Sequence, residues 1–255
     1  MFRSLIVAKY TLQEAIKSKL LLNVVFLGLA LLGITLIATS LTYGAAEKVS
    51  LDVGLGLISL ALKVIAVFYG VGIIQQEIET RSIYLILSRP IARSSYLIGR
   101  IAGMGAMLFL NIVILGPFAI LLFAIQGGEL SGLMIWTLLF TFFESIILLL
   151  LLVVFSLFCS KVLAILFSIS AYIGGYVSSS LLESNKFVDN VFINATLKVS
   201  NFILPNFSRL NIRDFLLYEQ KLPSPELFQS LSHAFIYSVS LILIGVVIFK
   251  EKNLD

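Results

Sequence analysis

The chain is poor in the side chains that build catalytic and metal sites. Its 255 residues include one cysteine and one histidine, and charged residues make up only 13%. A single cysteine, Cys159, excludes an internal disulfide and a cysteine-cluster metal site. His233 has no second histidine with which to share a metal ion, and no nucleophile–base cluster accompanies it. We therefore expect no metal, no cofactor and no enzymatic activity such as that of a membrane-embedded protease.

A nucleotide-binding loop is also missing. The Gly-x4-Gly-Lys-Ser/Thr motif cradles nucleotide phosphates in ATPases. The nearest match, Gly28 to Gly33, is followed by Ile34 and lies in an apolar run. If ATP drives this protein, a separate subunit must hydrolyse it.

Long apolar runs dominate the rest of the chain. Hydrophobic residues account for 59%, whereas an ordinary soluble domain is about half apolar and about a quarter charged. The first run starts at Leu20 and is too long for the apolar part of a signal peptide. Since a helix needs about 20 apolar residues to cross a bilayer core, the sequence predicts an all-α integral membrane protein, a single domain with six transmembrane helices. The expected spans are 20–43, 51–75, 97–125, 133–159, 162–182 and 226–249.

The net charge of +4 matters through its distribution across the bilayer, and we expect no nucleic-acid partner. Cytoplasmic flanks of membrane proteins are rich in Lys and Arg. Most of the 18 basic residues fall on one side of the predicted spans: Arg3, Lys9, Lys17, Lys19, Arg81, Arg89, Arg93, Arg100, Lys161, Lys250 and Lys252. We therefore expect both termini to be cytoplasmic.

Three segments lie outside the predicted spans, and residues 1–19 are the first. Apolar side chains recur there at roughly helical spacing: Phe2, Leu5, Ile6, Leu12, Ala15 and Ile16. With Lys9 and Lys17 at polar positions, this pattern predicts an amphipathic helix on the cytoplasmic membrane surface. A frayed basic tail that only sets topology is the alternative.

The second segment, 76–96, joins two spans on the cytoplasmic side. It opens with charge at Glu77 and Glu79, continues with apolar side chains such as Ile83, and Pro90 ends any helix. The apolar side chains need a cover, either the membrane surface or another protein.

The third segment, 183–230, lies on the outer side and is too apolar for a disordered linker. One helical face carries Val188, Val191, Phe192, Ala195, Val199 and Phe202. Pro205 interrupts this pattern, and Ser224 with Pro225 offers an N-cap and a first-turn proline for the last helix. We expect the loop to fold back on the outer membrane surface.

Two ionisable residues, Lys63 and Glu144, lie deep in predicted spans at similar depth. An isolated charge at the bilayer centre costs on the order of 3 kcal/mol, which favours an ion pair within the bundle or across a dimer. The pair could be a structural clamp or part of a polar translocation path.

Small residues at intervals of four predict close helix packing. Ser170, Gly174 and Ser178 form such a stripe in span five, and Gly99 and Gly103 form one in span three. The span-five stripe is a candidate dimer face, and packing within one subunit is the alternative.

The second segment also carries a recognisable motif. Ser88-Arg89-Pro90-Ile91-Ala92-Arg93, followed by Tyr96-Leu97-Ile98-Gly99-Arg100, resembles the Ser/Thr-x-Pro-hydrophobic-x-Arg and Gly-Lys elements of the type-2 ABC transporter permease family. The six spans and the long outer loop are similar to that family too. Two positions depart from it: Arg81 stands where glycine is common, and Arg100 replaces a lysine.

The resemblance implies a permease subunit of an ATP-driven exporter in the plasma membrane of a bacterium or archaeon. Segment 76–96 would hold a coupling helix that docks on a separate cytoplasmic ATPase, and the outer loop would form short re-entrant helices. A second permease copy or a paralogue would complete the transporter. The residues implied in ATPase coupling are Glu77, Glu79, Arg81, Ile83, Leu85, Ile86, Arg89 and Arg93.

One alternative function stays open from the sequence. The chain could be a mechanical transmission subunit that relays ATP-driven motion to an outer partner without moving a solute. The long outer loop, 183–230, would then be the docking surface.

Overall fold

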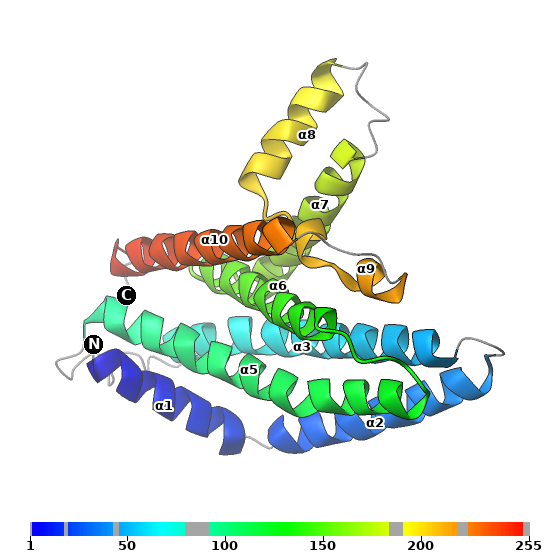
Figure 1. Cartoon of the computed structure of the whole chain (residues 1–255). Helices are drawn as coiled ribbons and strands as arrows, with labels where there is room; N and C mark the ends of the chain where they lie inside the picture. Colours follow the sequence, from blue (N-terminus) through cyan, green and yellow to red (C-terminus); the bar gives the residue numbers. More distant parts are fainter. Residues whose placement is uncertain are drawn as a thin grey trace.

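The computed structural model describes residues 2–17, 20–42, 46–79, 92–183, 191–218 and 224–251, and within these ranges every regular element is a helix (Figure 1). The elements are α1 (Phe2–Lys17), α2 (Leu20–Ser40), α3 (Ala46–Glu79), α5 (Arg93–Ile125), α6 (Leu133–Ser156), α7 (Lys161–Glu183), α8 (Val191–Ile203), the 3-10 helix η1 (Ser208–Leu210), α9 (Arg213–Leu217) and α10 (Ser224–Glu251).

Among the described residues, five helices are long and apolar enough to cross a membrane. Their apolar stretches are Ala46–Val71, Arg93–Ile125, Leu133–Ser156, Lys161–Leu181 and Pro225–Glu251. They coincide with the second to sixth predicted spans, so the chain is a multi-pass membrane protein. Helix α2 occupies the place of the first predicted span, and the count of six spans stays a prediction.

Helix α6 lies at the centre of the structure. Helices α3, α5, α7 and α10 all pack against it, and its leucine run, residues 148–152, is buried. The second half of this helix, residues 146–155, is apolar on every side, which is the pattern of a helix segment surrounded by others. The turn that precedes it needs Gly127, whose φ of 87° favours glycine.

Helices α7 and α8 pack on each other and project together from the other helices (Figure 1). The two termini lie near each other at one end of the molecule (Figure 1). Helix α8 ends before Pro205, as the sequence predicts, and α10 is described from Ser224. Large apolar side chains stay exposed on this pair, among them Ile173, Val199 and Ile203.

Helix α1 packs along the start of α5 rather than standing apart from the bundle. A Cβ atom at Gly99 would lie 2.7 Å from the carbonyl oxygen of Ser4, and one at Gly103 would lie 2.8 Å from that of Ala8. The two glycines therefore let the α1 backbone approach α5 within the same chain, and the close helix packing predicted for this pair of glycines is an α1–α5 contact. Leu5 remains exposed on the other face of α1.

Candidate functional site

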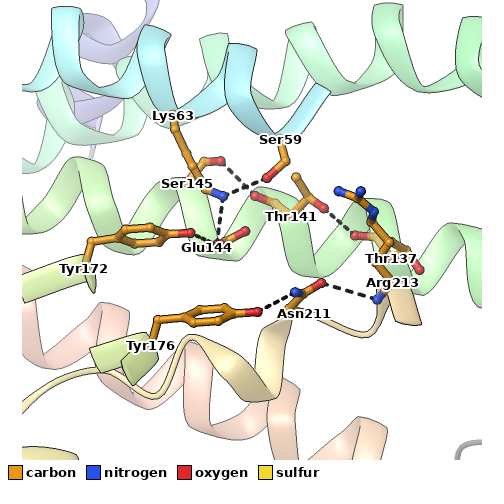
Figure 2. A network of polar contacts seen from close by, with 10 residues as sticks. All are labelled: Ser59, Lys63, Thr137, Thr141, Glu144, Ser145, Tyr172, Tyr176, Asn211 and Arg213. Atoms are coloured by element: carbon orange, nitrogen blue, oxygen red, sulfur yellow. Dashed lines mark hydrogen bonds and ion pairs between the residues drawn. The ribbon is translucent and has the colours of Figure 1, made fainter. Parts of the chain in front are cut away.

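The two intramembrane charges meet in the middle of the structure. Lys63 on α3 lies with its Nζ 3.0 Å from Oε1 of Glu144 on α6, and it donates to Ser59 Oγ at 2.8 Å. The hydroxyl of Tyr172, on α7, donates to Glu144 Oε1 at 2.7 Å (Figure 2). Lys63 Nζ also lies 5.1 Å from the centroid of the Tyr172 ring. Three helices thus share one ion pair.

The polar face of α6 continues from Glu144 toward the N-terminal end of the helix. Thr141 and Thr137 lie one and two turns before it, and Ser145 follows it. Each hydroxyl donates to the carbonyl oxygen four residues earlier, at 2.8 Å. Figure 2 shows these bonds for Thr141 and Ser145. These hydroxyls are satisfied within the helix and keep lone pairs for another donor.

A cavity of about 170 Å³ borders this face, and we call it the polar chamber. Its walls come from α3, α6, α7 and the η1–α9 segment, and it is lined by Leu55, Ser59, Lys63, Thr137, Thr141, Glu144, Tyr172, Tyr176, Leu210, Asn211, Ile212 and Arg213. An engineered apolar cavity of about 150 Å³ is large enough to hold benzene, and it contains no water because its walls offer no polar partners. The polar chamber has room for several water molecules with polar partners, so its charges need not be fully dehydrated.

The η1–α9 segment closes one side of the polar chamber. Arg213 Nε donates to Asp52 Oδ1, on α3, at 2.6 Å, and a second guanidinium nitrogen pairs with the same oxygen. A Cβ atom at Gly56 would lie 3.0 Å from Arg213 Nη1, so the glycine makes room for the guanidinium. Asn211 Nδ2 meets the Tyr176 hydroxyl at 2.8 Å (Figure 2).

A second polar cluster lies near the end that carries both termini. Arg100 on α5 is paired with Glu77 on α3 and with Glu14 on α1, the latter at 2.7 Å. The Tyr96 hydroxyl donates to Glu77 Oε2, and Arg100 Nη1 donates to Thr11 Oγ1 at 3.2 Å. We call Glu14, Glu77, Tyr96 and Arg100 the Arg100 junction.

The Arg100 junction is largely closed to solvent. The side chains of Arg100 and Glu77 are 8% and 12% exposed, whereas that of Glu14 is 60% exposed. Burial, and next the Glu14 carboxylate, raise the pKa of Glu77 above its usual value. The buried position therefore disfavours a charged Glu77, and the Arg100 guanidinium is the group that compensates it.

Helix α10 joins the same region at its C-terminal end. The Phe249 ring stacks on Tyr96 with centroids 6.2 Å apart. Arg93 Nη1 donates to the Lys250 carbonyl oxygen at 3.3 Å. The ends of four helices, α1, α3, α5 and α10, therefore meet around Tyr96 and Arg100.

The residues implied in ATPase coupling fall into three groups. Glu77 faces Arg100 and Tyr96 of its own chain, and Arg93 lies at the start of α5. Glu79 is the last residue of α3, and its side chain lies outside the described residues. Also outside them lie Arg81, Ile83, Leu85, Ile86 and Arg89.

The small-residue stripe of α7 is divided between two surroundings. Ser170 is exposed. A Cβ atom at Gly174 would lie 3.1 Å from Leu204 Cδ1 of the same chain, and Ser178 is buried. Only the Ser170 end of the stripe is open to a second chain, so the dimer face stays a prediction there.

Several site residues escaped the sequence analysis. The spacing of Thr137 and Thr141 before Glu144 was a usable signal, because i, i+4 and i+7 share a helix face. The residues that come from other elements, such as Tyr172 and Arg213, carry no local signal. Arg100 was noticed as a departure from a motif, without its partners.

Comparison with known proteins shows the family. A family model described as ABC-2 family transporter protein matches residues 5–218, from α1 through α9. No curated protein matches the chain.

Proposed function

Because the chain belongs to the ABC-2 family of transporter proteins, we propose that it is the permease subunit of an ATP-binding-cassette exporter that a separate ATPase subunit powers. The observation that carries the proposal is the family match over residues 5–218 of a multi-pass membrane protein. In this proposal α2 is a sixth span and both termini are cytoplasmic, as the distribution of Lys and Arg favours.

The ATPase contact is proposed for the connection between α3 and α5. The connection begins after Glu79, the last residue of α3, and ends at Arg93, the first residue of α5. The Arg100 junction holds these two helix ends together. The connection contains the apolar residues Ile83, Leu85 and Ile86, which gain a cover when a partner docks. Glu79 and the arginines at 81, 89 and 93 supply charge for a polar rim.

For the intramembrane ion pair we propose the role of a clamp within one subunit. Lys63 and Glu144 have further partners in their own chain, Ser59 and Tyr172. No second chain is needed to neutralise either charge, which supports a clamp rather than a bridge across a dimer. The adjacent polar chamber leaves a polar route past the clamp open as the other role.

A second permease copy or a paralogue is proposed to pack on α7. The exposed Ser170 lies beside exposed apolar residues of the same helix, including Phe167 and Ile173. Small residues at such a face let two helices approach closely in a membrane.

Mechanical transmission to an outer partner is the second candidate function. The observation that favours it is the projecting α7–α8 pair, whose α8 exposes Val199 and Ile203. In this alternative these side chains would bind a partner protein, and no solute would cross. Transport assays on the complex separate the two functions.

The first test is co-expression with the ATPase subunit encoded beside this chain, purification through a tag on this chain, and measurement of ATPase activity. We expect an active ATPase to co-purify with wild type and to be lost with Glu79→Lys plus Arg89→Glu. The matched control is Lys198→Glu, which changes an exposed charge on α8. A chain that purifies without any ATPase would overturn the proposal.

A further inference from the structure

The Arg100 junction is built for more than neutralising a charge. A buried arginine is costly unless it is paired and hydrogen-bonded, and a single carboxylate would suffice to pair it. Arg100 instead contacts side chains of three helices: Glu14 and Thr11 of α1, Glu77 of α3, and Tyr96 of its own helix α5. A planar guanidinium with five donors is suited to such branched bonding.

The two arms of the Arg100 junction differ in burial. The Glu77 side chain is nearly buried, and its carboxylate also accepts a hydrogen bond from the Tyr96 hydroxyl. The Glu14 arm is mostly exposed. Loss of the Glu14 carboxylate should therefore remove the ion pair between α1 and Arg100, while the buried Arg100–Glu77 pair remains.

Close packing also holds α1 against α5. Gly99 and Gly103 bring the α1 backbone against α5, and Thr11 contacts both Gly103 and Arg100. Helix α1 is thus held by packing and by charge over the same two turns. Glu77 lies two residues before the end of α3, so the point at which the chain leaves α3 is held by the same guanidinium.

We infer that Arg100 is a positioning residue that makes the adjoining ends of α1, α3 and α5 move as one unit. The inference rests on the proposed function, because the motion in question is the one that an ATPase delivers to the connection between α3 and α5. A displacement there is passed to α5 and α1 together instead of bending the end of α3 alone. The helix that the sequence predicts at the membrane surface becomes part of the moving unit.

The test measures the distance between α1 and α3 in the complex with its ATPase. Spin labels are placed on Lys9→Cys and Phe68→Cys, two exposed positions, in a Cys159→Ser background. Double electron–electron resonance is recorded without nucleotide and after trapping with ATP and vanadate. In the labelled Cys159→Ser chain that keeps Arg100 and Glu14, we expect one α1–α3 distance that does not change on trapping. In the same chain with Glu14→Gln, we expect a second α1–α3 distance to appear on trapping.

Arg100→Gln should show the same second population, and Arg100→Lys a smaller one, because lysine keeps the charge but loses the fork. If Arg100→Gln fails to fold, Glu14→Gln decides alone, since its carboxylate is exposed. The matched control is Glu226→Gln, which removes an exposed carboxylate near the start of α10. This variant should show the same single α1–α3 distance as the labelled Cys159→Ser chain.

Two results would overturn the inference: an α1–α3 distance that changes on trapping in the background chain, or a Glu14→Gln chain that is indistinguishable from the background. Failure of the proposed function looks different, because no ATPase activity would co-purify with any of these chains. The ATPase measurement on the same samples therefore separates the two failures.

Discussion

The polar chamber and the Arg100 junction both hold ionised side chains among helices, but they differ in the cation and in the space around it. In the polar chamber Lys63 meets one carboxylate and two hydroxyl-bearing neighbours beside a cavity of about 170 Å³. In the junction Arg100 meets the nearly buried carboxylate of Glu77 and the mostly exposed carboxylate of Glu14, and no cavity borders the Glu77 side among the pockets described. Lysine is a compact point charge that water can also solvate, whereas arginine bonds several partners in one plane.

The difference between the two sites determines whether water can replace a counter-ion that a substitution removes. Water can enter a polar cavity and solvate a charge that has lost its counter-ion. A closed site offers no such substitute, so the remaining charge is left buried and uncompensated. Substitutions in the Arg100 junction should therefore cost more stability than equivalent ones in the polar chamber.

Arg100→Gln should give the largest effect. It removes the guanidinium that favours the charged form of Glu77. Because burial raises the pKa of Glu77, this carboxylate must then take up a proton or stay buried as an uncompensated charge, and breaking a buried ion pair costs about 3–5 kcal/mol. Unfolding of the purified protein in mixed micelles measures the loss, with Lys9→Gln on exposed α1 surface as a charge-matched control. Equal stability of the two variants would show that the junction is not closed.

Glu144→Gln should cost less, about 1–3 kcal/mol, because a charged hydrogen bond is lost but Lys63 keeps Ser59 and the chamber. The double variant with Lys63→Met should be more stable than the sum of the two single losses predicts, since both charges are then gone. The same unfolding assay on the wild type, the two single variants and the double variant completes a double-mutant cycle. Unchanged stability in all three variants would show that the pair contributes nothing.

Gly103→Ala tests the steric part of the junction. The new methyl group would lie 2.8 Å from the Ala8 carbonyl oxygen, so α1 must shift, at a cost of about 1–3 kcal/mol. Gly105→Ala, on the same helix, would meet only the tip of Ile146 at 3.2 Å and is the matched control. A larger loss in the control than in Gly103→Ala would contradict the packing of α1 on α5.

The features that could be predicted from the sequence are those that depend on the length of an apolar run. The predicted span 133–159 starts where α6 starts, at Leu133, and the last predicted span lies within α10. The equal depth of Lys63 and Glu144 followed from counting residues, because helical rise is constant.

What could not be predicted depends on which helices meet. Arg213 and Asp52 are 161 residues apart, and neither carries a local sign of the other. The stripe of Gly99 and Gly103 signalled a close approach, but not that α1 is the approaching helix. The role of Glu77 in ATPase coupling stays a prediction, and its contact with Arg100 on another helix carried no signal in the sequence.

Asp52→Asn should give the smallest effect on stability and a clear effect on access. The Asp52 and Arg213 side chains are 43% and 31% exposed, and ion pairs at such positions contribute about 0–1 kcal/mol. The pair nevertheless joins α3 to α9 over the polar chamber, so its loss should loosen that side. In a Cys159→Ser background, Ser59→Cys should react faster with a membrane-impermeant thiol reagent after Asp52→Asn. Lys198→Cys, on exposed α8, should react equally fast in both, and a Ser59→Cys rate that does not change would show that the chamber is closed by something other than this ion pair.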